Sequence, residues 1–342
     1  MRVGILGITG YSGMTLYSLL AQHPKVTEIV LYGNAQHQAD LTLQNVVPGF
    51  GNNPQPIQAF DTAKVQQETD CLFCATPSGV TAHLVGPLLA AQFPVIDLSG
   101  DFRLHSAKLY QHWYHQTDRI LPDAAQITYG LSEFTDSYQS YIANPGCYAT
   151  ATLLALAPLA KAGLLESDFI VVDAKSGVSG AGKNPSASAH FPAINENLQV
   201  YRLNQHQHIP EIMQQLKKWD GQLDAIQFST TLLPITRGIM VNIYAKIKHS
   251  ISQSAIEQLF QQTYAQSPFV RFRGATLPTI KEVVGSNFCD IGINWNPRTQ
   301  IVTLVSVIDN LMKGAAGQAV QNFNKYFGFE ETLALPKYPL FP

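Results

Sequence analysis

Residues 2–21 read RVGILGITGYSGMTLYSLLA, and this stretch decides the fold predicted for the N-terminal part of the chain. Residues 2–7 form an apolar strand pattern, a glycine-rich turn follows, and Met14–Ala21 has the apolar spacing of a helix. Strand, glycine turn and helix in this order are typical of a Rossmann-type domain, in which the helix N-terminus faces a dinucleotide pyrophosphate. The glycines are spaced GxxGxxG rather than GxGxxG, so a glycine turn without a ligand is the alternative interpretation.

The loops after the following strand patterns are expected to complete this nucleotide site, because ligands bind at the carboxyl edge of a parallel sheet. A second strand–loop–helix pattern starts at Cys71–Ala75, and Phe93–Leu98 is a further strand pattern. No acidic residue follows the strand pattern Val26–Tyr32, where an NAD site usually places one, and this favours NADP. The cofactor-binding residues predicted in these loops are Gly7, Thr9, Gly10, Tyr11, Ser12, Gly13, Asn34, Thr76, Pro77, Ser78 and Gly79.

Cys147 is the candidate nucleophile. It lies between the turn signal Pro145-Gly146 and the helical pattern Ala149–Ala162, in which Pro158 is expected to bend or end the helix. A thiol at the start of a helix faces backbone N–H groups and the positive end of the helix dipole, and both favour the nucleophilic thiolate. The strand pattern Tyr141–Ala143 would bring this thiol to the edge at which the cofactor is expected. A buried structural cysteine is the alternative.

The second half of the chain has a different pattern. From about Asp168 onward, apolar alternation recurs with few intervening helices, which predicts an α+β domain with a mixed sheet. His206 and His208 precede a helical pattern, and one of them is expected to serve Cys147 as acid/base. A metal site or plain surface histidines are the alternatives. Arg103 and Arg237 are candidate grips for phosphate or carboxylate, and each is equally well explained by a surface ion pair.

Composition limits the classes of protein to consider. The chain has 342 residues, enough for two domains, and its 46% hydrophobic content excludes a disordered chain. The net charge of −2 and the lack of a basic block argue against nucleic acid and anionic membranes as partners. No apolar run is long enough to span a bilayer, and the N-terminus does not read as a signal peptide, so a cytoplasmic protein is expected.

Cysteine usage fits a reducing compartment, because four cysteines in this length do not make a disulfide framework. Cys71 and Cys74 form a CxxC pattern within an apolar strand pattern. Residues three apart on a strand point to opposite faces, so we expect these two thiols to pack rather than to share a metal or a disulfide. No metal site is expected.

Motifs that run along the whole chain can be read together. They are GITGYSG at 7–13, ATPSG at 75–79, LSGDFRL at 98–104, NPGCYAT at 144–150, KSGVSGAGK at 175–183, HQHIPEI at 206–212 and DNLMKGAAGQAVQ at 309–321. With them the chain resembles the N-acetyl-γ-glutamyl-phosphate reductases of arginine biosynthesis. The sequence departs from the family at Ala149, where a proline is usual, and at Gly33-Asn34, which lacks the family's basic or serine-rich tip.

The resemblance implies an NADP-binding Rossmann domain over residues 1–146 and about 311–342, and an α+β catalytic and dimerisation domain over residues 147–310. It implies Cys147 as nucleophile, His208 as acid/base and Asn310 near the nicotinamide, and a homodimer or homotetramer. Gly180 is also expected to contact the cofactor. The residues expected to bind the substrate are Arg103, Ser179, Gly180, Glu211 and Arg237.

The reaction implied by the resemblance is the NADP-dependent reductive dephosphorylation of N-acetyl-L-glutamyl 5-phosphate to N-acetyl-L-glutamate 5-semialdehyde through a cysteine thioester. An acyl phosphate would be the substrate and inorganic phosphate a product. Alternatives with the same chemistry are an aspartate-semialdehyde dehydrogenase and a lysine-pathway reductase of a carrier-bound acyl phosphate. A thiol hydrolase or acyltransferase, and a non-catalytic NADP-binding regulator, are alternatives from other classes.

Overall fold

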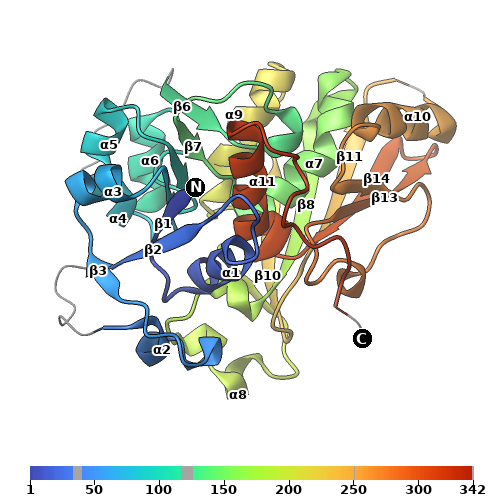
Figure 1. The fold of residues 1–342 in the computed structure, drawn as a ribbon. Helices are drawn as coiled ribbons and strands as arrows, with labels where there is room; N and C mark the ends of the chain where they lie inside the picture. The colour runs from blue at the N-terminus through green and yellow to red at the C-terminus, as the bar shows by residue number, and fades with distance from the viewer. Residues whose placement is uncertain (34–40, 117–125, 250, 341–342) are drawn as a thin grey trace. The chain divides into compact units, whose positions relative to one another are not determined.

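The computed structural model describes residues 1–33, 41–116, 126–249 and 251–340, and the chain divides into two compact units (Figure 1). The first unit comprises Met1–Pro145 and Ala315–Leu335, and the second comprises Gly146–Gly314 and Pro336–Pro342. The domains expected from the sequence are 1–146 plus about 311–342, and 147–310, so the segment from Pro336 onward is expected in the first unit. It belongs to the second unit, in which the Leu340 N–H donates to the Val284 carbonyl.

The first unit is built on a seven-stranded sheet in the order β3-β2-β1-β4-β5-β7-β6, with all neighbouring strands parallel. The strands β1, β4, β5 and β7 are nearly continuous buried runs, as expected for parallel strands covered on both faces by helices. This confirms the predicted Rossmann-type domain. The strands are β1 (Arg2–Leu6), β2 (Glu28–Gly33), β3 (Ile57–Ala59), β4 (Cys71–Cys74), β5 (Val95–Asp97), β6 (Ile127–Tyr129) and β7 (Tyr141–Ala143).

One helical stretch of the first unit is interrupted. The pattern at residues 80–91, which reads as continuous, forms two short helices because Pro87 lacks an N–H and its ring obstructs the preceding turn. The helices and 3₁₀ turns of this unit are α1 (Tyr11–Leu20), α2 (Leu43–Val46), η1 (Pro48–Phe50), α3 (Thr62–Glu68), α4 (Val80–Leu84), α5 (Gly86–Ala90), α6 (Ala107–Tyr114), η3 (Ser132–Phe134) and α11 (Gly317–Tyr326).

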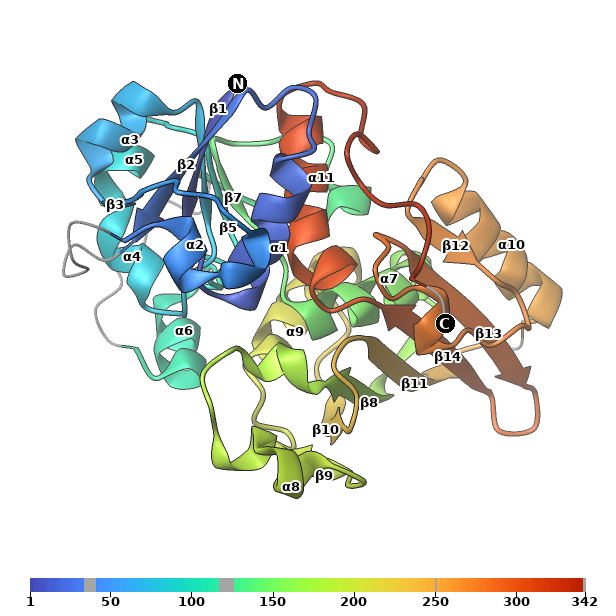
Figure 2. The same ribbon diagram turned by 60° about the horizontal axis from the view of Figure 1, so that its bottom comes forward.

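The C-terminal helix α11 lies beside α1, red next to blue in Figures 1 and 2. Buried amides attach it to the rest of the first unit. Asn324 Oδ1 lies 2.8 Å from Nε2 of the buried His23, and Asn322 Nδ2 donates to Gly130 O at 2.8 Å and to Asn144 Oδ1 at 3.0 Å. Because Asn144 precedes the Cys147 turn in the chain, α11 helps to fix the end of β7 from which that turn departs.

The second unit is built on a seven-stranded mixed sheet in the order β12-β13-β14-β11-β8-β10-β9. β8 pairs parallel with β10 and β12 with β13, while the remaining pairs are antiparallel, so the predicted mixed sheet is confirmed. In β11, buried residues alternate with more exposed ones, which shows that one face of the sheet is covered. The strands are β8 (Leu165–Gly177), β9 (Gln199–Tyr201), β10 (Gln227–Leu233), β11 (Ile239–Ile247), β12 (Val270–Phe272), β13 (Cys289–Asn296) and β14 (Ile301–Ile308).

Helix α7 packs on β11 and β14 and against its neighbour α9. Figure 2 shows α8 and β9 at the opposite end of this unit from α10. The helical elements are α7 (Cys147–Lys161), η4 (Val178–Ala181), η5 (Ala187–Ala189), α8 (Phe191–Ile194), α9 (His208–Trp219), α10 (Gln253–Tyr264) and η6 (Ile280–Glu282), with a π-helical turn, η7 (Met312–Ala316), where the chain returns to the first unit.

Helix α7 starts at Cys147, two residues earlier than its apolar pattern suggests, and does not end at Pro158. A proline in a helix leaves the carbonyl four residues earlier without its helical N–H donor. Here that carbonyl belongs to Leu154, and it accepts a hydrogen bond from the hydroxyl of Tyr264 in α10. A tertiary contact that the local sequence does not reveal therefore replaces the missing helical bond.

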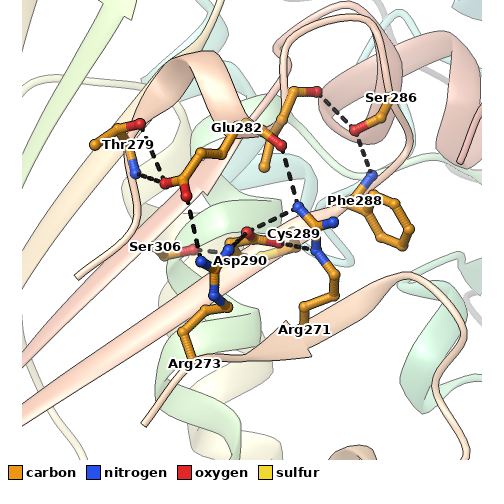
Figure 3. A network of polar contacts seen from close by, with 10 residues as sticks. Arg271, Arg273, Thr279, Glu282, Ser286, Phe288, Cys289, Asp290 and Ser306 are labelled. Atoms are coloured by element: carbon orange, nitrogen blue, oxygen red, sulfur yellow. Dashed lines mark hydrogen bonds and ion pairs between the residues drawn. The ribbon is translucent and has the colours of Figure 1, made fainter. Parts of the chain in front are cut away.

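Asp290 forms the centre of a polar cluster at the β12–β13 edge, made of Arg271, Arg273, Glu282 and Asp290 and called here the Asp290 cluster (Figure 3). Arg271 donates to Asp290 through Nε at 2.6 Å and Nη2 at 2.8 Å, and Arg273 donates through Nη1 at 2.7 Å. Arg273 also reaches Glu282 Oε1 at 3.2 Å. Two cations thus compensate a fully buried carboxylate, and they hold β12 and η6 against β13.

Candidate functional site

The glycine turn of the first unit connects β1 to α1 and is shaped by close backbone packing. Gly7 has φ +97°, and a Cβ there would lie 2.6 Å from Ala75 O in the neighbouring loop. A Cβ on Gly13 would lie 2.2 Å from Gly7 O. Only glycine fits at both positions, because the first needs a left-handed backbone and the second lets α1 approach the end of β1.

This turn has the donors that a pyrophosphate needs. The first intrahelical hydrogen bond of α1 runs from Met14 N to Gly10 O at 2.9 Å, so the N–H groups of Tyr11, Ser12 and Gly13 precede the helical ladder. At Gly10 no atom would lie within 3.7 Å of an added Cβ, and Thr9 is exposed, so the turn leaves room for a ligand. The residues present therefore fit the phosphates of a dinucleotide.

The second predicted cofactor loop, residues 76–79, uses several of its polar groups internally. Ser78 Oγ donates to Ser99 O at 2.8 Å, and Gly79 N donates to Asp101 Oδ1 at 2.6 Å. Thr76 Oγ1 lies 2.7 Å from Thr81 Oγ1. A bound cofactor could therefore contact the exposed ring of Pro77 and the backbone of this loop more readily than it could accept hydrogen bonds from Ser78 and Gly79. The predicted contact Asn34 lies outside the described residues.

Arg103 is buried and donates to main-chain carbonyls, from Nε to Asn144 O at 2.7 Å and from Nη2 to Leu98 O at 2.9 Å. These bonds fix the end of β7 just before the Cys147 turn, a supporting role that the sequence did not suggest. Arg237 Nη2 lies 2.9 Å from Asp309 Oδ2, with a quarter of its side chain exposed. Of the two predicted anion grips, Arg237 is thus a partly exposed partner of the buried Asp309, and Arg103 holds backbone.

The Cys147 turn, defined as Gly146 and Cys147, is fixed from α9. Glu211 is completely buried, and its Oε1 accepts the Gly146 N–H at 2.8 Å. The first hydrogen bond of α7 is from Thr150 N to Gly146 O at 2.8 Å, so Cys147 occupies the first helical position and its N–H precedes the ladder. Cys147 is partly exposed, as a nucleophile must be, while Cys71, Cys74 and Cys289 are buried.

Two side chains lie against this turn at close range. A Cβ on Gly146 would lie 2.2 Å from Nε2 of His208, so the imidazole ring rests on the bare Cα of the residue before Cys147. A Cβ on Gly314 would lie 2.8 Å from the Cβ of Cys147. Both glycines are needed for these approaches, and the second gives a reason for Gly314 in the motif at 309–321.

The two histidines have different surroundings, although both are buried. His206 Nδ1 accepts the backbone N–H of His208 at 3.2 Å, and its burial, together with the nearby Arg202 charge, lowers the pKa of His206 to about 3. The ring of His208 is the one that reaches the Cys147 turn. The contacts therefore favour His208 over His206 as the acid/base partner of the thiol.

The glycine-serine loop after β8 is joined to Asn310. Asn310 Nδ2 donates to Ser179 Oγ at 2.9 Å, and its Oδ1 accepts from Gly238 N at 2.8 Å. A Cβ on Gly180 would lie 2.8 Å from Ser176 Oγ. Asn310 therefore links the loop that carries Ser179 to the loop that carries Arg237 and Gly238.

Two family models match successive parts of the chain. Residues 2–140 match the model described as "Semialdehyde dehydrogenase, NAD binding domain", and residues 147–310 match "Semialdehyde dehydrogenase, dimerisation domain". The chain is 52% identical over 342 residues to N-acetyl-gamma-glutamyl-phosphate reductase 2 of Lactiplantibacillus plantarum, with all of both chains covered. It is 53% identical over 344 residues to the N-acetyl-gamma-glutamyl-phosphate reductase of Limosilactobacillus fermentum, again with full coverage of both.

The chain belongs to the N-acetyl-gamma-glutamyl-phosphate reductase family. Solved structures with the same fold include aspartate semialdehyde dehydrogenase II of Vibrio cholerae complexed with ASA, with TM-score 0.69 and 18% identity over 94% of this chain and 97% of the other. Another is aspartate semialdehyde dehydrogenase with NADP from Candida albicans, with TM-score 0.66 and 13% identity over 96% and 99% of the two chains. At these identities the likeness shows the fold alone.

For this member of the reductase family, sequence reasoning missed several residues around Cys147. It placed Glu211 at the edge of the substrate pocket, and the structure adds the hydrogen bond from the Gly146 N–H to Glu211 Oε1. It did not find Tyr201, whose hydroxyl lies 2.9 Å from that of Tyr148. No local signal joins these tyrosines, because they come from separate elements, α7 and β9. The run of small residues around Gly314 indicated a close approach in the sequence, but it did not indicate that the partner is Cys147.

Over the described parts of the chain, no group of three or more His, Cys, Asp or Glu side chains is arranged to hold a metal ion. None of the described helices is long and apolar enough to cross a bilayer. The CxxC thiols lie in β4, where burial raises the pKa of both Cys71 and Cys74 and so disfavours the reactive thiolate.

Proposed function

We propose that this chain reduces N-acetyl-L-glutamyl 5-phosphate to N-acetyl-L-glutamate 5-semialdehyde in arginine biosynthesis, with release of inorganic phosphate. The observation that carries the proposal is the arrangement at Cys147. A partly exposed thiol occupies the first position of α7, the His208 ring lies against Gly146, and Glu211 accepts the N–H of Gly146. The names of curated relatives about half identical over their full length support the substrate.

The first chemical step is acyl transfer to sulfur. The Cys147 thiolate attacks the carbonyl carbon of the acyl phosphate, the C–S bond forms, and the C–O bond to phosphate breaks, which leaves a thioester. Before the attack, His208 takes the proton of the Cys147 thiol and becomes an imidazolium. The backbone N–H groups of Cys147, Tyr148 and Ala149, which precede the α7 ladder, are candidates to stabilise the oxyanion.

The second step converts the thioester to an aldehyde. A reduced nicotinamide nucleotide, when bound, supplies a hydride to the thioester carbon. Cys147 holds that carbon in place, and the His208 imidazolium donates its proton toward the oxygen of the tetrahedral thiohemiacetal. The C–S bond then breaks as the proton on this oxygen returns to His208, which releases the aldehyde and restores the thiolate.

The cofactor is proposed to be NADP, bound with its pyrophosphate at Gly10, Ser12 and Gly13. The absence of an acid directly after Tyr32-Gly33 supports a 2′-phosphate over a ribose hydroxyl. A steady-state comparison of NADPH with NADH tests this: a higher kcat/KM with NADPH is expected. Equal values would remove the preference without affecting the reaction.

We place the substrate beside the loop that carries Ser179 and Gly180, with Arg237 as the candidate for an anionic group. The side chain of Arg237 is 28% exposed and its charge is partly balanced by Asp309, so it can turn part of its fork to a carboxylate or phosphate. Glu211 and Arg103 are proposed to act through the backbone that they hold. An Arg237→Lys variant is expected to raise KM more than it lowers kcat.

Self-association is proposed as a homodimer or homotetramer through the second unit. Its matched model is described as a dimerisation domain, and it exposes large apolar side chains at Phe169 and Tyr244 on the neighbouring strands β8 and β11. Sedimentation equilibrium tests this, and a single species of monomer mass at micromolar concentration would refute it.

The direct test of the function is phosphate-dependent reduction of NADP⁺. We expect N-acetylglutamate semialdehyde to support this reaction with a kcat/KM at least about a hundredfold above that of aspartate semialdehyde, because a site that pairs buried polar groups discriminates strongly. A preference for aspartate semialdehyde would overturn the substrate. Hydrolysis of acyl groups without any nucleotide would instead favour a thiol hydrolase.

A further inference from the structure

Three aromatic side chains lie around His206, next to His208. Tyr148, Tyr201 and Phe228, together with His206, are called here the imidazole box. The ring centroid of His206 lies 5.3 Å from that of Tyr148, 6.1 Å from Tyr201 and 5.9 Å from Phe228. The tyrosine contacts are edge-to-face, which is a favoured geometry for aromatic rings.

The imidazole box contacts His208 on two sides. The ring of His208 lies 4.6 Å from that of His206 at an interplanar angle of 70°, and 6.0 Å from that of Tyr148, also at 70°. Because Nε2, Cε1 and Cδ2 of the same ring lie against Gly146, the box limits how the His208 ring can tilt relative to the Cys147 turn.

One hydrogen bond of the box depends on the protonation state of His206. Its Nδ1 accepts the His208 N–H at 3.2 Å, which a nitrogen without a hydrogen alone can do, so the ring carries its proton on Nε2. The charged and titratable groups that contact it or act on it are Tyr148 on α7, Tyr201 on β9, the charge of Arg202 just after β9, and His208 on α9. Burial keeps the pKa of His206 low, so this acceptor is present at neutral pH.

The box is also joined to the nucleophile through the chain. Tyr148 directly follows Cys147 in α7, and its hydroxyl lies 2.9 Å from that of Tyr201, on the edge strand β9. Tyr201 is in turn paired with Thr230 of β10. The orientation of the His208 ring and the start of α7 are therefore fixed by the same group of side chains.

We propose that His206 is a positioning residue that holds the His208 ring toward Cys147, through its Nδ1 acceptor and its ring contact, and takes no part in proton transfer itself. This positioning role of His206 rests on the proposed function only in that His208 is the acid/base of that reaction. If it is right, the site requires an acceptor at the position of Nδ1 and not a second titrating imidazole.

Two substitutions separate these possibilities. His206→Asn keeps an acceptor near the position of Nδ1 but removes the titrating ring, whereas His206→Leu fills a similar volume without an acceptor. We expect His206→Asn to keep kcat within about threefold, and His206→Leu to lower kcat by about ten- to thirtyfold with a smaller change in KM, since misplaced catalytic groups act mainly on the chemical step.

The second readout needs no substrate. Alkylation of Cys147 by iodoacetamide is followed as a function of pH in the full-length protein, with Cys147→Ser as the background control for the buried thiols. His206→Asn is expected to keep the wild-type midpoint. His206→Leu is expected to raise the midpoint by about one pH unit, because a displaced His208 stabilises the thiolate less well. A role in folding alone would lower thermal stability and leave this midpoint unchanged.

The outcomes are decisive. Equal loss of kcat in both His206 variants would show that the imidazole itself is required and would overturn the proposal, as would an unshifted midpoint in His206→Leu. Should that variant not fold, Tyr201→Phe, which removes only the hydroxyl pair, must shift the midpoint in the same direction, and no shift there overturns the proposal too. If alkylation behaves as expected while no acyl phosphate is reduced, the proposed function fails and the positioning role stands.

Discussion

Asp290 and Glu211 are both completely buried carboxylates of the second unit, but they have different partners. Asp290 accepts hydrogen bonds from two guanidinium groups, at 2.6, 2.7 and 2.8 Å (Figure 3). Glu211 Oε1 accepts the N–H of Gly146, next to the nucleophile, at 2.8 Å. The first carboxylate is compensated by cations that hold strands together, whereas the second is placed where it fixes a reactive turn.

This difference indicates that burial of an acid alone does not mark a functional site. What matters is the atom to which the acid is bonded. Changes at the Cys147 turn should lower turnover more than stability, and changes in the Asp290 cluster should lower stability and leave turnover intact.

The largest effect is expected at the nucleophile. Cys147→Ser should lower kcat by about 10⁴-fold or more, because a serine hydroxyl stays protonated where a thiol ionises. Affinity for NADPH, followed by its fluorescence, and the thermal midpoint should stay close to wild type. Residual activity above about one per cent of wild type would contradict a covalent mechanism.

The next effect is expected at the acid/base. His208→Ala should lower kcat by about a hundredfold or more and flatten the pH dependence of kcat/KM. The matched control is His249→Ala, since His249 is exposed on the surface of the same unit, and it should behave as wild type. If instead a loss of this size appeared in His206→Asn and not in His208→Ala, the two histidine roles would have to be exchanged.

A smaller effect is expected at Glu211. Glu211→Ala removes the acceptor of the Gly146 N–H and should lower kcat by about ten- to a hundredfold, because the nucleophile loses its alignment. Glu211→Gln keeps an acceptor oxygen and should retain at least about a third of wild-type kcat. Comparable losses in both variants would mean that the negative charge, and not the hydrogen bond, is what the turn requires.

The smallest effect on activity is expected at Asp290. Asp290→Ala leaves two guanidinium groups near an apolar side chain and should cost about 2–3 kcal/mol of unfolding free energy, less than for fully buried pairs because both arginines are about one-third exposed. The midpoint of urea denaturation measures this loss. A fall in kcat without a shift of that midpoint would break the proposed separation between the two carboxylates.

The sequence predicts much of the fold because its signals are local. The apolar run and glycines at 2–21, and the alternation in Ile239–Ile247, specify a strand, turn or helix without distant partners. It also finds Cys147 and the histidine pair, because their chemistry and their turn–helix context lie within a few residues of one another.

The remaining features depend on contacts between distant residues. Nothing local shows that Tyr264 replaces the helical bond lost at Pro158, or that Gly314 lies against Cys147. Arg103 looks like an anion grip in LSGDFRL, and in the structure its Nε and Nη2 donate to the carbonyls of Asn144 and Leu98. Sequence indicates which residues carry charge or reactivity, while the partner that decides their role is set by tertiary packing.

The most direct test of the account is to trap the acyl enzyme. The full-length protein is mixed with N-acetylglutamyl phosphate without nicotinamide nucleotide, quenched in acid and analysed by peptide mass spectrometry. The account predicts one N-acetylglutamyl group on the peptide that contains Cys147, removed by hydroxylamine, and none in Cys147→Ser. An unmodified Cys147 in a preparation that turns over the same substrate, or an acyl group on Cys71, Cys74 or Cys289 instead, would contradict it.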